Sequence, residues 1–485
     1  MRFVRGETGK ADLNSYAPLY HFSIDQPTVF WTLLWDFVGI RGSGERDPVL
    51  VDDEGMSEAS WFPGVSLNFA QNLLRFDDDR IAIRCHDTDG EHEPISYAQL
   101  QRRVAALAAA MKSRGVEAGD LVASLLPYVP DALVAMLASA SLGAIWFACP
   151  PGSGTDATRE LLAPLAPKVL LFGDDSALPD IDLPGLAVLL FVPGHASTGT
   201  MPGGALALAD FVAPFVDAEI EFTAVPFDHP LYLTRAVLPA NRGEILVHGT
   251  GGTLIQHLKE LVLHADIKRE DKIFFHAGND SMAWYWLASS LAIGSTLVLH
   301  AGSDLPPDDA SLWDLVDELG ISVLGLHGLW LDAAAQSGLR PVETHRLLTL
   351  KTILTAGTAL APESYEYVYR DIKQRVLLSP LTTGGDTLAC FALGAPILPV
   401  WIGELACRGL GMKVEVSNAA GEAVLSEAGD LVCSAPFPSM PLGFCNDDDG
   451  QRFAAAYFSR QPGRWCSGER AMLTPRETLR LGDQA

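Results

Sequence analysis

Two arginines, an asparagine and a glutamate stand in a loop whose polar groups could face an anion. The loop covers residues 234–244, and these members are Arg235, Asn241, Arg242 and Glu244. A phosphate cradle needs hydroxyl donors, free backbone N–H groups and positive charge, because several anionic oxygens are neutralised together. The guanidinium groups supply charge, but Pro239 has no N–H and Glu244 is itself an anion. The composition therefore predicts a poor grip on a triphosphate.

Two short strands and a helix must position this loop. Residues 231–233 and 245–247 are apolar and predict strands, and the glycine-rich run 248–252 follows the second. From Leu254 the apolar period becomes helical, with Leu258, Leu261 and Val262 on one face. We expect the polar residues of this helix to point away from that face; they are Gln256, His257, Lys259 and Glu260. An ordinary surface hairpin is the plainer interpretation of the whole block.

Strands and helices alternate along much of the chain. Predicted strands are 121–126, 144–147, 169–172, 272–275 and 296–300, and predicted helices are 96–113, 131–142, 157–165, 282–293 and 362–376. This order is typical of α/β proteins with a largely parallel sheet covered on both faces. Residues 132–149 carry no charge, but serines and a glycine interrupt them. A buried helix followed by a buried strand therefore fits better than a membrane span. Residues 192–204 predict a surface loop.

Composition narrows the class of protein. The net charge of −26 and the pI near 4.7 argue against binding nucleic acid or an anionic membrane. Seven cysteines without CxxC spacing predict reduced thiols and no zinc site. The N-terminus lacks the continuous apolar core of a signal peptide. We therefore expect a cytoplasmic protein without a bound metal.

One longer motif carries a resemblance to a known family. Residues 61–74 read WFPGVSLNFAQNLL, which is similar to the entry motif WFPGxxLNxAxNLL of acetyl- and acetoacetyl-CoA synthetases. Both ends of the block 228–264 also resemble acetoacetyl-CoA synthetase, a member of the adenylate-forming superfamily of acyl-CoA ligases. The resemblance implies an α/β fold, the large N-terminal domain of that superfamily, with layered αβαβα sheets and a small distorted β-barrel.

The resemblance also implies a domain order. The expected parts are an N-terminal extension with the entry motif (1–75), two α/β subdomains (76–225 and 226–390) and the β-barrel (391–485). Enzymes of this superfamily continue through a hinge into a C-terminal domain, which supplies a lysine for adenylation and then helps to shape the pantetheine tunnel. Because the chain stops at Ala485, we expect that domain to be absent.

Three further motifs resemble the nucleotide site of the family. Residues 351–360 look like the adenine turn, which implies contacts from Gly357, Thr358 and Ala359. Residues 382–387 align with SGGTDI, which assigns nucleotide contacts to Thr382, Thr383, Gly384 and Asp386, with Asp386 beside magnesium. Gly385 stands where the family has a threonine. Residues 465–469 resemble WxHGD, so Glu469 is expected at the ribose hydroxyls.

Two regions depart from the family. Its phosphate loop reads about SSGTTGxPK, whereas this chain has lost the hydroxyls and carries Glu244 at the lysine position. At an effective dielectric constant of about 20, a like-charge contact at about 4 Å costs on the order of 4 kcal/mol. The family's turn that lines the acyl pocket reads about YTTTGWMMWNWL, whereas residues 276–287 here read HAGNDSMAWYWL. The change before Met282 implies a roomier pocket or drift in a pocket no longer used. The acyl-pocket residues expected from the resemblance are His276, Asn279, Ser281 and Trp284.

These departures lead to three hypotheses. The first is an acyl-CoA ligase of natural-product biosynthesis that does not adenylate, binds the AMP moiety of a preformed acyl-adenylate and supports its transfer to CoA. Its partners are then CoA, a small carboxylic acid as its adenylate, and a separate adenylating ligase, with magnesium left open. The second is an inactive scaffold protein, and the third is an active acetoacetate–CoA ligase. Catalytic residues are not assigned.

Overall fold

Two eight-stranded sheets form the body of the molecule. The computed structural model describes residues 1–87, 90–149, 154–173, 181–193, 201, 203–278, 281–301 and 305–482. The first sheet has the order β12 (Leu206–Ala207), β11 (Val188–Val192), β10 (Val169–Gly173), β8 (Leu121–Leu125), β9 (Ile145–Ala148), β14 (Pro230–Arg235), β15 (Ile245–Gly249) and β25 (Gly443–Phe444). It is parallel from β12 to β14 and antiparallel from β14 to β25.

The second sheet is parallel along most of its width. Its order is β20 (Leu377–Pro380), β19 (Thr352–Ala356), β18 (Val323–His327), β16 (Lys272–Phe275), β17 (Thr296–His300), β5 (Ile81–Asp87) and β6 (Gly90–Glu91), with β7 (Ile95–Ser96) beside β5. The short strands β6 and β7 run antiparallel to β5. The prediction of largely parallel sheets is confirmed in both. Because β5 joins the second sheet while β14 and β15 join the first, each sheet combines distant parts of the chain.

Smaller sheets complete the strand set. A four-stranded antiparallel sheet consists of β23 (Val414–Ser417), β24 (Ala428–Cys433), β26 (Trp465–Leu473) and β27 (Leu479–Leu481), and corresponds to the expected barrel as an open half-barrel. The others are β1 (Gly42–Gly44), β4 (Val65–Leu67) and β13 (Val225–Pro226) in one sheet, and the pairs β2 (Leu50–Val51) with β3 (Ser60–Trp61) and β21 (Ala392–Leu393) with β22 (Cys407–Arg408).

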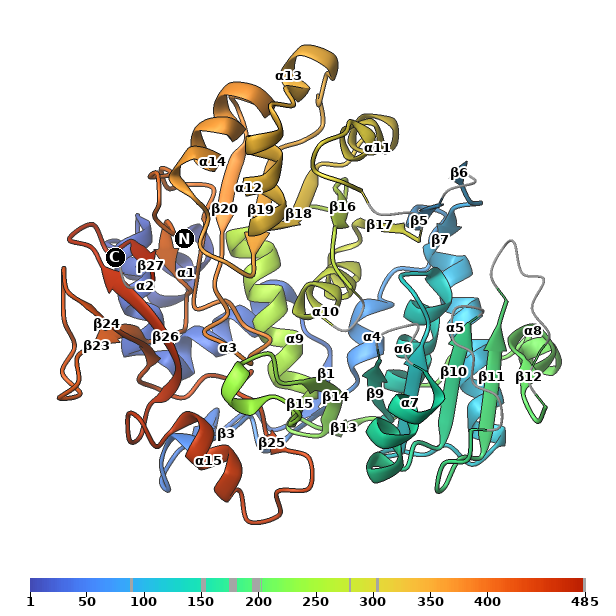
Figure 1. Cartoon of the computed structure of the whole chain (residues 1–485). Coiled ribbons are helices and arrows are strands. Elements are labelled where there is room, and N and C mark those ends of the chain that lie inside the picture. The colour runs from blue at the N-terminus through green and yellow to red at the C-terminus, as the bar shows by residue number, and fades with distance from the viewer. Residues whose placement is uncertain are drawn as a thin grey trace.

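The helices cover the sheets in layers (Figure 1). They are α1 (Arg2–Thr8), α2 (Tyr16–Asp25), α3 (Pro27–Val38), α4 (Phe69–Leu73), α5 (Tyr97–Ser113), α6 (Pro130–Ser141), α7 (Thr155–Leu162), α8 (Leu208–Val212), α9 (Thr250–Lys259), α10 (Met282–Ser289), α11 (Ser311–Leu319), α12 (Gly328–Ser337), α13 (Pro341–Thr344), α14 (Pro362–Tyr367) and α15 (Gln451–Tyr457). The helix predicted over 96–113 is confirmed as α5, and Ser96 and Gln99 form a reciprocal capping box at its start. In the part of the chain that the structure describes, no helix is long and apolar enough to cross a membrane.

Some predicted boundaries are wrong for identifiable reasons. Within the motif 61–74, the pattern after the Pro63-Gly64 turn predicts a helix from Ser66, but the helix begins at Phe69, because β4 continues through Leu67 and Asn68 accepts the capping hydrogen bond from the Gln71 N–H. The helix expected over 362–376 ends its last turn at Ile372, and β20 starts at Leu377. Most of the loop predicted at 192–204 lies outside the described residues.

Helix α9 lies at the centre of the molecule, where we expected one exposed polar face. It contacts α3, α4, α10, β14 and β15, so its whole circumference is covered. Gln256, His257, Lys259 and Glu260 are each 0% exposed, which makes the predicted solvent face wrong. The approach at its start is close: a Cβ at Gly252 would lie 1.9 Å from the Pro438 carbonyl oxygen, so a glycine is required there.

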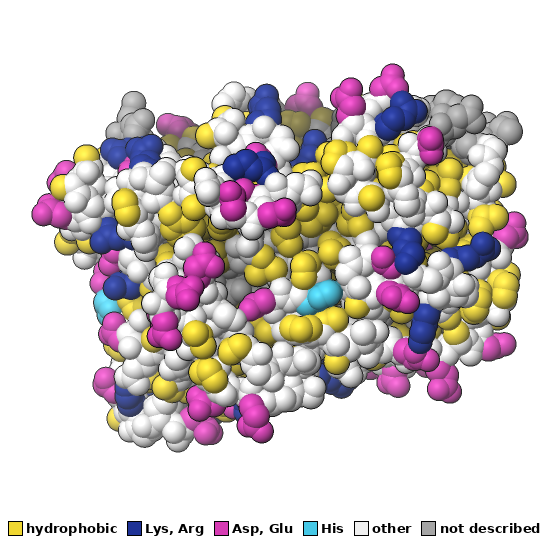
Figure 2. Space-filling view, turned by 90° about the horizontal axis from the view of Figure 1, so that it is seen from below, with side chains coloured by type: hydrophobic (Ala, Val, Ile, Leu, Met, Phe, Trp, Pro, Cys, Tyr) yellow, Lys and Arg dark blue, Asp and Glu magenta, His cyan; other side chains and the backbone are white. Residues whose placement is uncertain are grey.

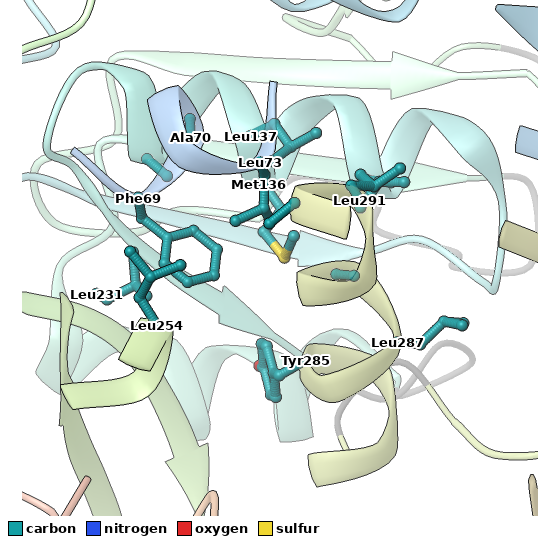
Figure 3. Close-up of a cluster of buried hydrophobic side chains, with 14 of the residues drawn as sticks. Phe69, Ala70, Leu73, Met136, Leu137, Leu231, Leu254, Tyr285, Leu287 and Leu291 are labelled. Atoms are coloured by element: carbon teal, nitrogen blue, oxygen red, sulfur yellow. The ribbon is translucent and has the colours of Figure 1, made fainter. Parts of the chain in front are cut away.

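Apolar side chains join α9 to its neighbours. Figure 3 shows Phe69 and Leu73 of α4, Met136 of α6, Leu254 of α9 and Tyr285 of α10 pointing into one cluster. All are buried. Since these residues come from separate sequence segments, their contacts fix the helices that approach the cavity described below.

Candidate active site

A cavity of about 1090 Å³ lies where the two large sheets meet the half-barrel. Its wall is formed by the ends of β14, β15, β16 and β19, by α10, and by β26 and β27. The predicted site residues that line it are Arg235, His276, Ser281, Gly357, Thr358, Ala359, Thr382, Thr383, Asp386 and Glu469. The face of the molecule seen in Figure 2 is hollowed near its middle, with hydrophobic side chains around the hollow.

The turn after β19 forms one flat part of the wall. Gly357 has φ +95°, and a Cβ there would lie 2.1 Å from the His327 Nε2, so only glycine fits without strain. His327 ends β18 and lines the cavity beside this turn. Sequence reasoning missed His327. Its position at the end of a buried strand that precedes the turn is the signal that could have found it.

Glu469 is a carboxylate with acceptor capacity left for a ligand. The Thr382 hydroxyl donates to it at 2.8 Å. Burial raises the pKa of Glu469 above its ordinary value, and the Thr382 hydrogen bond opposes that shift. A carboxylate has room for about four hydrogen bonds. Glu469 can therefore accept further donors, such as a pair of hydroxyls.

Asp386 has its hydrogen-bonding capacity filled by the protein. Its Oδ1 accepts the N–H groups of Val237 at 2.6 Å and Leu238 at 3.2 Å. Its Oδ2 accepts the Tyr457 hydroxyl at 2.6 Å and the Asn241 side-chain amide at 3.3 Å. Four donors occupy both oxygens, so Asp386 does not fit the predicted magnesium contact in this arrangement. The described residues contain no group of three or more His, Cys, Asp or Glu that could hold a metal ion.

Of the remaining residues in the 382–387 turn, Gly385 and Thr387 line the cavity, whereas the predicted contact Gly384 does not. The Gly384 carbonyl accepts the Trp465 indole N–H at 3.1 Å. The Thr387 hydroxyl donates to the Thr383 carbonyl at 2.7 Å, so it is held by the backbone. Gly385 has φ +102°, and a Cβ there would lie 2.6 Å from the Ser467 Cβ. A threonine at position 385 would clash in this backbone conformation.

The loop 236–244 is held in place from both sides. Asn241 is buried against Asp386, whereas Arg242 is exposed and does not line the cavity. Glu244 points to α15, where the Arg452 guanidinium binds it at 2.6 Å, and it also does not line the cavity. The expectation that Glu244 faces the phosphate position is therefore wrong. Of the two arginines in this loop, Arg235 lines the cavity.

Only some of the residues predicted for the acyl pocket line the cavity. His276 and Ser281 line the cavity, and Asn279 lies outside the described residues. Trp284 does not line the cavity, because its ring packs edge-on against the Tyr128 ring, with 4.8 Å between the two ring centroids. Trp286, two residues further along α10, lines the cavity instead. A helix turns by about 100° per residue, so two residues separate the inner from the outer face.

His248 is a second residue that sequence reasoning missed. It lines the cavity from the end of β15, and its Nε2 lies 2.8 Å from the Thr234 hydroxyl. Burial lowers its pKa to about 3, so the imidazole is neutral at ordinary pH. A neutral ring can donate or accept, which makes His248 a polar group in an otherwise apolar stretch of wall.

The fold is that of an AMP-binding α/β enzyme, and comparisons with known proteins agree. The family described as AMP-binding enzyme matches residues 69–197. The chain is 37% identical to the acetoacetyl-CoA synthetase of Xenopus tropicalis, across 96% of this chain and 73% of that protein. It is 31% identical to a malonamoyl-CoA synthetase of Penicillium aethiopicum, across 96% of this chain and 69% of that protein.

A solved structure gives the same relationship. The acetoacetyl-CoA synthetase from Streptomyces lividans superimposes with a TM-score of 0.90 and 31% identity, over 99% of this chain and 77% of that one. The chain therefore belongs to the acetoacetyl-CoA synthetase family of acyl-CoA ligases.

Proposed function

We propose that this chain is an acyl-CoA ligase that does not make its own adenylate. It binds an acyl-adenylate formed by a separate adenylating ligase and supports transfer of the acyl group to CoA. The observation that carries the proposal is Asp386, whose two oxygens are occupied by four donors of the protein. The proposed setting is natural-product biosynthesis in the cytoplasm.

The same hydrogen bonds remove two requirements for binding ATP. Adenylation must hold a triphosphate together with its metal ion. The N–H groups of Val237 and Leu238 are directed at Asp386, so they are not available to phosphate oxygens. Asp386 is in turn not available to a metal. Residues 235–244 contain no hydroxyl side chain that could replace those donors.

The rest of the cavity retains groups for the other parts of an acyl-adenylate. Gly357, Thr358 and Ala359 offer a flat turn for adenine, and Glu469 offers acceptors for ribose hydroxyls. Arg235 can face the single negative charge of the acyl phosphate. A ligand with one charge meets these contacts without needing the occupied donors.

A second candidate is the complete reaction from acid, ATP and CoA. Two observations favour it: close relatives bear the name acetoacetyl-CoA synthetase, and Arg235 supplies a cation to the cavity. In that case the Asp386 hydrogen bonds must open when Mg-ATP arrives. The two candidates therefore differ in one measurable property, the response to ATP.

Exchange of labelled pyrophosphate into ATP tests the first half-reaction directly. We expect no exchange with a panel of small carboxylic acids, together with formation of acyl-CoA from a synthetic acyl-adenylate and CoA. Acid-dependent exchange would establish the complete ligase and refute the proposal. Absence of acyl-CoA from every supplied adenylate would favour the scaffold hypothesis.

Thermal melting supplies an independent test. A ligand at about a hundredfold excess over its dissociation constant stabilises the folded state by roughly 2.7 kcal/mol. A non-hydrolysable acyl-sulfamoyl adenosine should raise the melting temperature clearly, AMP slightly, and Mg-ATP no more than AMP. A larger shift with Mg-ATP would contradict the proposal.

A further inference from the structure

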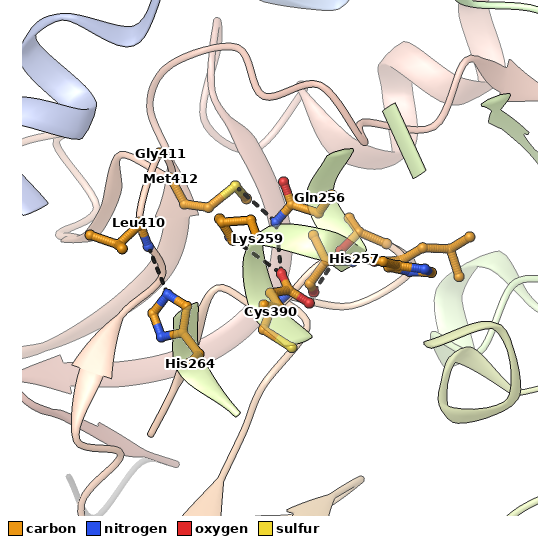
Figure 4. Close-up of polar contacts among 12 residues, drawn as sticks. Gln256, His257, Lys259, His264, Cys390, Leu410, Gly411 and Met412 are labelled. Atoms are coloured by element: carbon orange, nitrogen blue, oxygen red, sulfur yellow. Dashed lines mark hydrogen bonds and ion pairs between the residues drawn. The ribbon is translucent and has the colours of Figure 1, made fainter. Parts of the chain in front are cut away.

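A fully buried carboxylate connects the central helix to the wall of the cavity. Glu260 follows α9 directly, and neither it nor Lys259 has any exposed side-chain surface. Its Oε2 accepts the Trp286 indole N–H at 2.9 Å. Its Oε1 accepts the Gln256 side-chain amide at 2.7 Å and the Cys390 backbone N–H at 2.8 Å. Figure 4 shows Gln256, Lys259 and Cys390 converging on this point.

The groups that Glu260 holds include part of the cavity wall. The Trp286 ring lines the cavity and packs edge-on against Phe275, another lining residue, at 5.5 Å. Cys390 follows the 382–387 turn, which forms another part of the cavity wall and carries the predicted nucleotide contacts. One carboxylate therefore connects the wall at α10 to the segment that supports the nucleotide turn.

A neighbouring histidine makes a parallel connection. The His257 Nε2 donates to the Leu388 carbonyl at 2.9 Å, and its Nδ1 lies 2.8 Å from the Ser289 hydroxyl. Leu388 lines the cavity, and Ser289 belongs to α10. The same two walls are thus joined twice, by adjacent turns of one buried helix.

The chemistry of the site requires a carboxylate. Burying an ionised group is costly unless it is paired and hydrogen-bonded, and Glu260 is paired with the residue before it, because the Lys259 Nζ lies 3.3 Å from its Oε1. Donors approach both of its oxygens. An amide of the same shape offers one acceptor oxygen, so its NH₂ group would face a donor. A buried donor left without an acceptor forces local rearrangement.

We propose that Glu260 is a positioning residue that sets acyl selectivity. It holds the Trp286 indole in the wall and fixes the spacing between that wall and the nucleotide turn, although Glu260 does not line the cavity. The proposal rests on the proposed function in one respect, because it takes the cavity to hold an acyl group. Glu260 is then a residue that determines which acyl group fits without touching it.

Matched carboxylate-to-amide variants test this inference. Glu260→Gln is compared with Asp271→Asn, a buried carboxylate that is bound by Lys351 at 2.6 Å and Ser322 at 2.8 Å before the first residue of β16. Asp271 does not line the cavity. The probes are acetyl, butanoyl, hexanoyl and octanoyl sulfamoyl adenosines, and the measured quantity is the ratio of the largest to the smallest dissociation constant among them.

We expect Glu260→Gln to reduce that ratio by about tenfold, because a charge-assisted hydrogen bond then no longer holds the Trp286 indole in the cavity wall. Asp271→Asn should lower the melting temperature but keep the ratio of the parent protein. An unchanged ratio in folded Glu260→Gln would overturn the proposal. If that variant does not fold, Glu260→Asp keeps the charge but cannot span Trp286 and Cys390, and the same reduction is expected.

A spectroscopic readout separates this inference from the proposed function. The indole N–H resonance of Trp286 is identified in ¹⁵N-tryptophan-labelled protein by its loss in Trp286→Phe. Its exchange with solvent should be at least about tenfold faster in Glu260→Gln than in the parent protein, and unchanged in Asp271→Asn. Equal exchange would refute the anchoring role. If no adenosine probe binds the parent protein, the proposed function fails while this readout still decides the role of Glu260.

Discussion

Asp386 and Glu469 are two carboxylates on the wall of one cavity, and their hydrogen bonding differs sharply. Asp386 accepts four donors from the loop and from α15, whereas Glu469 accepts the Thr382 hydroxyl. Both occupy motif positions where the family places acidic residues. The comparison teaches that an acidic side chain in a motif indicates function only if its acceptor capacity remains free. Asp386 has become part of the wall, while Glu469 can still receive a ligand.

The largest expected effect comes from removing the filled carboxylate. Asp386→Ala leaves the Val237 and Leu238 N–H groups and the Tyr457 hydroxyl without their acceptor, so we expect a loss on the order of 3 kcal/mol in the free energy of unfolding. Urea denaturation measures it. Tyr457→Phe removes one donor and keeps the rest, and it should cost about 1 kcal/mol. Equal losses in the two variants would mean that Asp386 does not organise the loop.

The open carboxylate should affect ligand binding more than folding. Glu469→Gln replaces a charged acceptor by a neutral one, so the affinity for an acyl-sulfamoyl adenosine should fall roughly 10- to 100-fold. Isothermal titration calorimetry measures this change. The stability of the free protein should change little, because the substitution also removes a partly buried charge. An unchanged affinity would show that Glu469 does not contact the nucleotide.

The sequence predicted the strands and helices around the cavity more reliably than the state of its polar groups. Apolar periodicity located α9 and β16, because buried apolar side chains recur at the spacing of the element. It could not show that Glu260 is buried too, since its partners include Trp286 of α10 and Cys390. The pairing of Glu244 with Arg452 joins residues 208 positions apart, so local sequence could not reveal that Glu244 turns away.

The pH dependence of binding should distinguish the carboxylates further. Burial raises the pKa of Glu469 above 4.5. The folded state therefore favours the protonated carboxyl group of Glu469. This group stabilises the folded protein below pH 4.5, and that stabilisation is lost as pH rises through the raised pKa. Ribose hydroxyls prefer the ionised form, so analogue affinity should increase over that same rise. Affinity measured across this range should be flat in Glu469→Gln, and a persistent slope would assign the dependence to another group.

Acid lability provides a check on that experiment. Burial lowers the pKa of His248 to about 3 and that of His257 to about 4. The ordinary pKa of histidine is 6.5. Each of these neutral histidines stabilises the folded protein above pH 6.5, and this stabilisation is lost as pH falls through the lowered pKa. This loss should occur equally in the parent protein and in Glu469→Gln. Melting curves without ligand separate it from the change in affinity.

The smallest effect is expected at Glu244, although its position in the family motif first suggested a large one. Its carboxylate binds Arg452 at 2.6 Å on the partly exposed side of the loop, away from the cavity wall. Exposed ion pairs contribute little to stability, so Glu244→Gln, which removes this pair and leaves the Arg452 contacts with the Cys445 and Asn446 carbonyls in place, should produce no resolvable shift in melting temperature.

Glu244→Lys restores the residue type of the family but meets the Arg452 guanidinium instead of a phosphate. It leaves the Val237 and Leu238 N–H groups on Asp386 and leaves Gly385 unchanged. We therefore expect no exchange of pyrophosphate into ATP in Glu244→Lys, either alone or combined with Arg452→Ala. Exchange in the single variant but not in the parent protein would show that one charge, rather than the occupied hydrogen bonds of Asp386, limits adenylation.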